Sequence, residues 1–317
     1  MQIYYLSSLS CDTIIKEHLA SSNINQTIPY RSKHSFNTTV PKFKTFLIVM
    51  IMSSPNDVEK RNVIRNTWIK LTSRSQSTVS YRFPVGVKKM QSSAREKLRD
   101  EHNVYNDLVF LHDVEEDYQL LTIKTAQTMK YADSHFDFKF LLKVDSDSFV
   151  RIGLLLKSLK DIDHPKLYWG FLDGRAKPFK KGKWKENDWV LCDRYLPYQL
   201  GGGYVLSKVL VSYIATNLPL LKMYKSEDVA VGAWLAGLDV KYVHDPRFDT
   251  EFASRGCNNE YLITHKQNES MMGVLYKNIV KTGKLCSKEF RKRPSYIYDF
   301  SVDPSLCCVR KNESRIP

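Results

Sequence analysis

The sequence contains no long apolar run. Its longest uninterrupted one, Phe46 to Met52, has seven residues and lies among strand signals, whereas a membrane-spanning helix needs about 20 apolar residues. A transmembrane helix is therefore excluded, and so is an ordinary signal peptide, which requires an apolar segment near the amino terminus. We expect any membrane anchor to be missing from this chain.

Zinc-like cysteine spacing is also absent. The six cysteines form neither two close pairs nor a cluster with histidine, which excludes the common structural zinc sites and favours disulfides. The sequence also has four Asn-x-Ser/Thr sequons, at Asn25, Asn37, Asn268 and Asn312. Because N-glycosylation and disulfides both belong to the secretory compartment, the chain is expected to be lumenal.

Acidic residues are fewer than basic ones. The 34 acidic and 48 basic side chains give a net charge of +14, which favours anionic partners such as nucleotides, phosphates or acidic glycans. The densest basic segment, 175–185, has only Phe179 and Trp184 as interleaved aromatics and lacks a recognisable nucleic-acid motif. We interpret it as a solvated loop and expect no nucleic-acid partner.

Internal repeats are absent, and 317 residues with 43% hydrophobic content suit one large or two ordinary globular domains. Residues 1–42 are rich in Ser, Asn and Thr without sustained periodicity, which predicts a stem-like or disordered leader. Residues 43–317 are predicted to be the folded domain. We divide it into a nucleotide-binding half at 43–160 and an acceptor-binding half at 161–317.

Apolar strands alternate with helical patterns in the first of these halves. The expected strands are 46–52, 79–87, 107–111 and 138–144, and the expected helices are 57–70, 92–101 and 117–134. Such alternation predicts an α/β fold with a Rossmann-like, mostly parallel sheet flanked by helices. Pro84 inside the second strand predicts an edge position or a bulge, because proline cannot donate a backbone hydrogen bond.

One strand runs directly into two aspartates. The apolar run 140–144 leads to Asp145-Ser146-Asp147, so both carboxylates are expected at the carboxyl end of a buried parallel strand, where open α/β sheets bind ligands. Two carboxylates one residue apart repel each other unless a positive charge lies between them. A divalent cation that bridges to a diphosphate would supply that charge. The alternative is a polar strand end followed by a helix N-cap.

A pair of arginines suggests an anion site. Arg61, Ile64, Arg65 and Trp68 follow helical spacing, so the two guanidiniums share one face of the helix and could hold a diphosphate by bidentate hydrogen bonds. The alternative is a surface stripe around a core tryptophan.

The second half is rich in Gly, Pro and aromatic residues, notably at 168–171 and 195–204. This composition suits a sugar-binding platform, because aromatic rings match the apolar faces of sugars and glycines permit close backbone approach. The three glycines at 201–203 would equally make a tight turn before a strand.

A further carboxylate pair, Glu227-Asp228, opens a helical stretch. The helix dipole favours acidic residues in a first turn, so the pair could be an ordinary cap. The functional alternative is a general base, since a hydroxyl nucleophile needs a carboxylate or an imidazole within hydrogen-bond reach.

Together these segments resemble the β1,3-glycosyltransferases of the galactosyltransferase family, which have a GT-A fold. The motifs lie in the family's order at 61–68, 83–86, 117–125, 145–147, 195–207 and 227–229. Segments 167–171, 193–207, 244–251, 254–257 and 261–267 are most similar to the members that act on the proteoglycan linkage region. The resemblance covers the chain from about Phe46 to the Cys307-Cys308 tail.

The resemblance implies inverting, metal-dependent transfer of galactose from UDP-galactose, in β1,3 linkage, to a galactosyl-xylosyl acceptor on proteoglycan core proteins. It also implies Mn²⁺ as the cofactor and a type II membrane protein of the Golgi lumen, whose anchor is not visible here. Alternatives are another β1,3-glycosyltransferase of the family, such as an N-acetylglucosaminyltransferase, and a catalytically silent glycan-binding relative. A phosphatase-like enzyme with a nucleophilic aspartate is disfavoured, because Phe149 stands where such enzymes usually have Thr or Val.

The same resemblance implies roles for individual residues. Asp147 is expected to be a direct Mn²⁺ ligand, with Asp145 and His265 as further ligands and His244 as the rival of His265. Asp228 matches the catalytic base. The expected donor-binding residues are Arg61, Arg65, Lys124, Asp145 and Asp147. The expected acceptor-binding residues are Trp169, Tyr198, Gly202, Gly203 and Glu227.

Two departures from the family pattern concern the metal motif and the cysteines. Ser146 replaces the middle one of three acidic residues, but alternate residues of an extended segment point to opposite sides, so metal ligation should survive. Five cysteines lie in the matching region, so at least one is unpaired or bonds to Cys11 or to another chain. The adjacent Cys307 and Cys308 leave the pairing open.

Overall fold

The computed structural model describes residues 42–75, 78–311 and 316–317, with the backbone alone at 73–75. The predicted leader thus lies almost wholly outside the described residues, as do three of the four sequons. Within the described residues, no helix is both long and apolar enough to cross a membrane.

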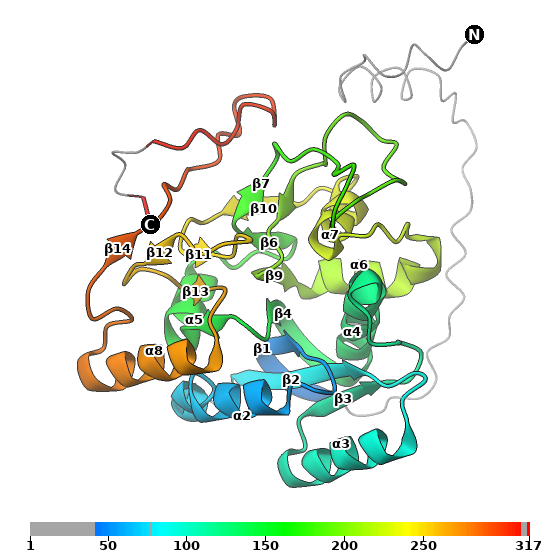
Figure 1. Cartoon of the computed structure of the whole chain (residues 1–317). Coiled ribbons are helices and arrows are strands. Elements are labelled where there is room, and N and C mark those ends of the chain that lie inside the picture. Colours follow the sequence, from blue (N-terminus) through cyan, green and yellow to red (C-terminus); the bar gives the residue numbers. More distant parts are fainter. Residues whose placement is uncertain (1–41, 76–77, 312–315) are drawn as a thin grey trace.

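The centre of the molecule is a seven-stranded sheet in the order β10-β6-β9-β4-β1-β2-β3 (Figure 1). Its strands are β1 Phe43–Met52, β2 Val79–Gly86, β3 Leu108–Leu111, β4 Phe136–Asp145, β6 Leu167–Gly170, β9 Gly203–Ser207 and β10 Lys241–His244. β9 runs antiparallel to both of its neighbours, β4 and β6, whereas the other pairings in this sheet are parallel. The predicted α/β class with a mostly parallel central sheet is confirmed.

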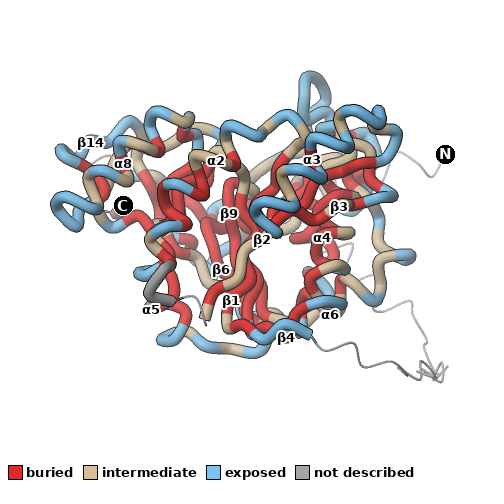
Figure 2. The backbone as a smooth tube through the Cα atoms, turned by 90° about the horizontal axis from the view of Figure 1, so that it is seen from below, coloured by how far each residue is buried: buried red, intermediate tan, exposed pale blue. Residues whose placement is uncertain are grey.

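Helices cover both faces of this sheet. They are α2 Val58–Asn66, α3 Ser92–Tyr105, α4 Leu121–His135, α5 Ile152–Asp161, α6 Lys208–Asn217, α7 Glu227–Leu235 and α8 Glu269–Thr282. Helices α2, α3, α5 and α8 contribute to one hydrophobic cluster, and α4, α6 and α7 contribute to another on the opposite face. In β1, Leu47 and Val49 point into the first cluster while Ile48 and Met50 point into the second. Burial on both faces explains the continuous apolar sequence of this strand (Figure 2).

The boundaries of the predicted elements shift by a few residues. The helix expected at 57–70 ends at Asn66 and is followed by the 3₁₀-helix η1, Lys70–Ser75, and the helix expected at 117–134 opens with the 3₁₀-helix η2, Tyr118–Leu120. A third 3₁₀-helix, η3, spans Leu218–Leu220.

Pro84 lies in an inner strand, so the predicted edge position is wrong. β2 pairs with β1 only as far as Arg82, whereas Pro84 itself pairs with Val109 of β3. The preceding residue, Phe83, donates its N–H towards β3, so the nitrogen of Pro84 faces the side where pairing with β1 has already ended. The missing donor therefore costs the sheet no hydrogen bond.

Short strands complete the molecule. β11 Phe248–Asp249, β13 Ile263–Thr264 and β5 Phe149–Val150 form a three-stranded sheet, and β7 Leu172–Asp173 pairs with β8 Tyr198–Gln199, as β12 Gly256–Cys257 does with β14 Phe290–Arg291. Disulfides join Cys257 to Cys286 and Cys307 to Cys308. None of the cysteines in the described part of the chain is free.

Candidate active site

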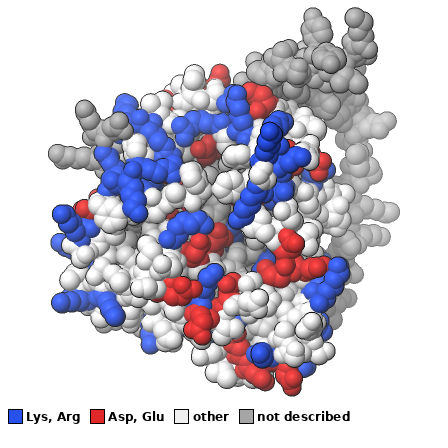
Figure 3. Space-filling model, viewed as in Figure 1, with Lys and Arg blue, Asp and Glu red and all other residues white. Residues whose placement is uncertain are grey.

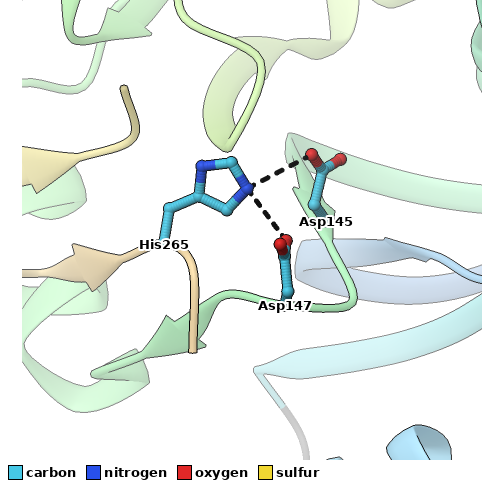
Figure 4. A group of neighbouring side chains, drawn as sticks. All are labelled: Asp145, Asp147 and His265. Atoms are coloured by element: carbon cyan, nitrogen blue, oxygen red, sulfur yellow. Dashed lines mark ion pairs between the residues drawn. The ribbon is translucent and has the colours of Figure 1, made fainter. Parts of the chain in front are cut away.

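Asp145, Asp147 and His265 come together at the carboxyl end of β4 (Figure 4). Asp145 is the last residue of β4, Asp147 lies in the turn before β5, and His265 directly follows β13. Because β13 pairs with β5, with Thr264 opposite Phe149, strand pairing carries the histidine to the aspartates. Nε2 of His265 lies 2.8 Å from Oδ1 of Asp147 and 3.7 Å from Oδ2 of Asp145.

The hydrogen bonds of His265 leave a lone pair directed at these carboxylates. Its Nδ1 lies 2.9 Å from the carbonyl oxygen of Glu251, which can only accept, so Nδ1 carries the ring hydrogen of the neutral imidazole. Nε2 is then an acceptor, and it is buried without a hydrogen-bond partner. Acceptors that face one another need a proton or a cation between them. Imidazole and carboxylate are ligands for Mn²⁺ and related ions, so these residues fit a divalent cation.

The charges around Asp147 keep it ionised. Burial opposes ionisation, but the adjacent imidazole of His265 and the positive charge of Lys266 hold the pKa of Asp147 well below its usual range. Burial also opposes the charged form of His265, yet the neighbouring carboxylates of Asp147 and Asp145 raise the pKa of the imidazole. Nζ of Lys266 lies 3.0 Å from Oδ2 of Asp147. The aspartate is therefore available as an anionic ligand at neutral pH.

His244, the rival ligand, is engaged elsewhere. Its Nδ1 accepts a hydrogen bond from the N–H of Leu172 at 3.1 Å, its Nε2 lies 2.9 Å from the carbonyl oxygen of Tyr296, and its ring stacks on that of Tyr296. Burial lowers the pKa of His244 to about 4, so the imidazole is neutral. With both nitrogens occupied, His244 is not a metal ligand.

Asp228 lies in the first turn of α7 and lines a cavity of about 450 Å³ together with Asp145 and His265, a size typical of small-molecule sites. Its Oδ2 accepts from the N–H of Gly201 and its Oδ1 from the N–H of Val229, both at 2.9 Å. Burial raises the pKa of the Asp228 carboxyl, although these N–H groups oppose the shift. A carboxylate with raised proton affinity in a cavity has the properties of a general base.

A buried lysine connects this helix to the aspartates. Lys143, 1% exposed, donates to Oδ1 of Asp145 at 2.7 Å and to Oε2 of Glu227 at 3.0 Å. The other oxygen of Glu227 accepts from the hydroxyl of Tyr204. Burial, reinforced by the neighbouring Asp228, raises the pKa of Glu227 to about 7 although Lys143 opposes it. Glu227 is 4% exposed whereas Asp228 is only partly buried, so Asp228 is the more accessible base.

The predicted acceptor residues separate into two groups. Tyr198, Gly202 and Glu227 line the cavity, but Trp169 and Gly203 do not. The side chain of Trp169 is 0% exposed, and Gly203 is buried within β9.

Trp169 belongs to the core because its strand, β6, lies inside the sheet. Its indole N–H donates to Asp245 at 3.1 Å, and its ring packs edge-on against Phe248. The acceptor-binding role predicted for Trp169 is therefore corrected to a packing role.

Gly202 leaves room for the His265 ring. A Cβ at this position would lie 2.5 Å from Nδ1 of His265 and 2.9 Å from the carbonyl oxygen of Thr250. Gly202→Ala is therefore expected to displace the imidazole and to weaken Mn²⁺ binding by roughly tenfold, the cost of misplacing a ligand. Titration calorimetry measures this. Gly237→Ala is the control, because nothing lies within 4 Å of the added Cβ there; equal affinities in both variants would contradict the prediction.

Arg61 and Arg65 do not reach the cavity. Every N–H of the Arg61 guanidinium is engaged, two by the carboxylate of Glu101 and the others by oxygens of residues 53–55. Arg65 pairs with Glu101 and with Asp107. Because their donors already have internal acceptors, the diphosphate-binding role predicted for these arginines is corrected to a structural one, in which they fasten α2 to α3.

Lys124 is held in a similar way. It is 3% exposed, and its Nζ donates to both carboxylate oxygens of Glu116, at 2.6 and 2.8 Å, and to the carbonyl oxygen of Ser53. Burial lowers the pKa of Lys124, although Glu116 opposes the shift. Its predicted donor-binding role is likewise corrected, because its ammonium group is already bound within the protein. Of the five predicted donor-binding residues, only Asp145 lines the cavity directly, and Asp147 adjoins it through His265.

Glu101→Gln is expected to lower the free energy of unfolding at pH 7 by about 3 kcal/mol, because it leaves two buried guanidiniums without their shared countercharge. Burial opposes ionisation, but Arg61 and Arg65 lower the pKa of Glu101 below 4.5, its value in the unfolded chain. This stabilisation is therefore complete above pH 4.5 and lost as the pH falls through the folded-state pKa.

Urea denaturation at several pH values measures this effect. The difference between wild type and Glu101→Gln should shrink on acidification, and the exposed Glu96→Gln on the same helix is the control. A difference that stays constant down to strongly acidic pH would contradict the ion-pair explanation.

Some residues of the site were not anticipated from the sequence. Lys143 does not line the cavity but bonds to two residues that do. The sequence signal for it was its place within the apolar run 140–144, because a lysine inside a buried strand must have partners. Segment 175–185 is a largely exposed loop, as predicted. Its members Arg175, Ala176, Phe179, Lys183 and Trp184 nevertheless line the cavity, which the sequence did not indicate.

Opposite charges surround the cavity, and Figure 3 shows basic and acidic side chains side by side on this face. The acidic lining residues are Asp145, Asp173, Glu227, Asp228 and Glu251, and the basic ones are Arg175, Lys183, Lys225, Lys266, Arg293 and Arg310. A site of this kind suits a ligand that carries negative charge on one part and hydroxyl groups on another.

Comparison of the sequence with known proteins leads to galactosyltransferases. Residues 59–246 match the sequence profile of the family described as Galactosyltransferase. "Beta-1,3-galactosyltransferase 6" of Mus musculus is 44% identical over 275 residues, which cover 86% of this chain and 85% of that protein. "Hydroxyproline O-galactosyltransferase GALT2" of Arabidopsis thaliana is 28% identical over 76% of this chain. The chain spans 36% of the length of this plant relative.

Among solved structures, a "glycosyltransferase involved in the glycosylation of the major capsid of PBCV-1" superposes with a TM-score of 0.42 and 12% sequence identity. The superposition covers 72% of this chain and 98% of that one.

Proposed function

Because this chain belongs to the galactosyltransferase family, we propose that it is an inverting, Mn²⁺-dependent enzyme that transfers galactose from UDP-galactose to a glycan in β1,3 linkage. The observation that carries the proposal is that Asp228 lines the same cavity as Asp145 and His265. These two residues form the possible cation site together with Asp147. A base and a cation site in one cavity are what a single displacement from a nucleotide-sugar requires.

The proposed reaction is one displacement at the anomeric carbon of galactose. The acceptor 3-hydroxyl oxygen forms the new bond while the bond to UDP breaks, and the electron pair of that bond leaves with UDP. Asp228 takes up the hydroxyl proton, and its raised pKa favours this role. Mn²⁺ held by Asp145, Asp147 and His265 would neutralise the charge that develops on the departing diphosphate. No covalent intermediate is needed.

Lys143 has a positioning role in this proposal. Asp145, Glu227 and Asp228 are three carboxylates that would otherwise repel one another, and the buried ammonium group of Lys143 bonds to the first two of them. It thereby holds the end of β4 and the start of α7 at a fixed separation, so that the distance between the base and the cation site does not change.

The acceptor proposed is the galactosyl-xylosyl core on proteoglycan serines, because five segments are most similar to family members that act on it. These segments are 167–171, 193–207, 244–251, 254–257 and 261–267. Residues 43–317 are then the catalytic domain, residues 1–42 a stem, and the Golgi lumen the place of action. The 44% identity to a mouse protein named as a β1,3-galactosyltransferase supports the donor and the linkage.

A donor and acceptor screen tests the proposal. Purified protein is incubated with UDP-galactose, UDP-N-acetylglucosamine or UDP-N-acetylgalactosamine, with and without a galactosyl-xyloside, in Mn²⁺ or in EDTA. We expect acceptor-dependent UDP release only with UDP-galactose and Mn²⁺, and a β1,3-linked galactose in the product. A product with another sugar or linkage would overturn the specific assignment, and UDP release that ignores the acceptor would indicate a hydrolase.

A further inference from the structure

The loop that follows β7 folds back over the cavity. Its segment 179–186 closes on itself, because the N–H of Glu186 donates to the carbonyl oxygen of Phe179 at 2.9 Å and the N–H of Lys185 donates to that of Gly182 at 3.1 Å. Gly182 has a φ of +80°, a conformation that glycine adopts without strain. We call this segment the 179–186 loop. Its sequence suggests only a solvated basic stretch, yet Phe179, Lys183 and Trp184 line the cavity.

Hydrogen bonds fix the 179–186 loop on two sides. On one side Glu186, 4% exposed, accepts from the N–H of Lys225 at 2.7 Å, three residues before the proposed base Asp228. On the other side the indole N–H of Trp184 donates to the hydroxyl of Tyr118 at 2.7 Å, just before α4. The loop therefore joins the start of α7 to the start of α4, next to the base.

Aromatic surface on this loop is left uncovered. Trp184 is 38% exposed, Phe179 48% and Tyr118 42%, and all three line the cavity. The ring centroids of Phe179 and Trp184 are 5.7 Å apart. Exposed aromatic rings in a cavity that also offers carboxylates match a ligand with one apolar face and a rim of hydroxyl groups, which is the surface of a sugar ring.

The position of the loop indicates which of the two sugars in the reaction it contacts, the donor or the acceptor. The cation site that would hold the donor diphosphate lies on β4 and after β13, whereas the loop is attached beside Asp228, the group that faces the acceptor hydroxyl. We propose that the 179–186 loop is an acceptor subsite in which Trp184, supported by Phe179, stacks on the apolar face of an acceptor sugar ring. This inference rests on the proposed function.

Kinetics of Trp184→Ala and Trp184→Phe test this proposal. Trp184→Ala should raise the acceptor KM roughly five- to tenfold, the worth of one stacking contact, while the Kd for UDP with Mn²⁺ stays near that of wild type in calorimetry. Trp184→Phe should raise the acceptor KM less, because a phenyl ring keeps a stacking face although it lacks the N–H that bonds to Tyr118. Phe290→Ala is the control, since Phe290 is 54% exposed and does not line the cavity.

Each outcome of these measurements supports or overturns the acceptor subsite. Equal rises in both Trp184 variants would show that the tether to Tyr118 matters rather than stacking, and an unchanged acceptor KM or a change confined to the donor KM would also overturn the subsite. If Trp184→Ala fails to fold, Phe179→Ala carries the same comparison. A wild-type chain that transfers no galactose overturns the proposed function and this inference with it, whereas active wild type with insensitive variants overturns the inference alone.

Discussion

Asp228→Asn is expected to reduce galactose transfer by about 10²- to 10⁴-fold, the usual contribution of a well-placed base. Asparagine has nearly the same shape, and its amide oxygen can still accept the N–H of Gly201 that Oδ2 of Asp228 accepts at 2.9 Å. It cannot take up the proton of the acceptor hydroxyl. The loss should therefore appear in kcat, while binding of UDP with Mn²⁺ remains close to that of wild type.

Initial rates over a range of acceptor concentrations, with calorimetry for UDP, measure this effect. Asp239→Asn is the matched control, because the Asp239 side chain is 90% exposed and away from the cavity. Normal turnover in Asp228→Asn would refute the assignment of the base. If turnover instead fell only in Glu227→Gln, the neighbouring carboxylate, whose pKa burial raises to about 7, would be the base.

Asp147→Ala is expected to weaken Mn²⁺-dependent UDP binding by roughly 100-fold or more, at the upper end of the effects of disturbing a metal site. Asp147 lies 2.8 Å from Nε2 of His265 and its pKa is held low, so it is an ionised oxygen ligand beside the imidazole. Alanine removes that ligand and leaves two of the three. The diphosphate then loses the cation that would bridge it to the protein.

Calorimetric titration of UDP in Mn²⁺ and in EDTA isolates the metal-dependent part of binding. In Asp147→Ala the two titrations should nearly coincide, whereas in wild type they should differ strongly. The exposed Asp113→Ala serves as the control and should behave as wild type. Unchanged Mn²⁺-dependent binding in Asp147→Ala would exclude the metal role of this residue.

Much of the fold could be predicted from local sequence patterns. The apolar runs that become β1 and β4 indicate strands buried on both faces, and their alternation with helical periodicity indicates a parallel sheet. What these patterns could not reveal is the reversed strand β9, because its direction depends on the path of the chain through the whole second half. The environment of Pro84 was mispredicted for a similar reason, since it depends on where pairing with β1 ends.

The candidate site could be predicted in part. Asp145 and Asp147 are recognisable because a strand leads into them, and Asp228 because it opens a helix. Trp169 was assigned to the acceptor site because composition alone does not tell a core tryptophan from one that faces a cavity. Trp184, in a segment that resembles a solvated loop, is the one that lines the cavity.

The sequence by itself determined the fold class, the family and the order of the acidic motifs, because these depend on periodicity and on residues close together in the chain. Tertiary structure alone decided which charged groups face the cavity. Arg61 meets Glu101 across 40 residues and Lys143 meets Glu227 across 84, and such distant pairings determine which arginines and lysines are already satisfied within the protein. A guanidinium or ammonium group whose hydrogen-bond donors are already paired in the interior has none left for a ligand, and only the folded chain shows its partners.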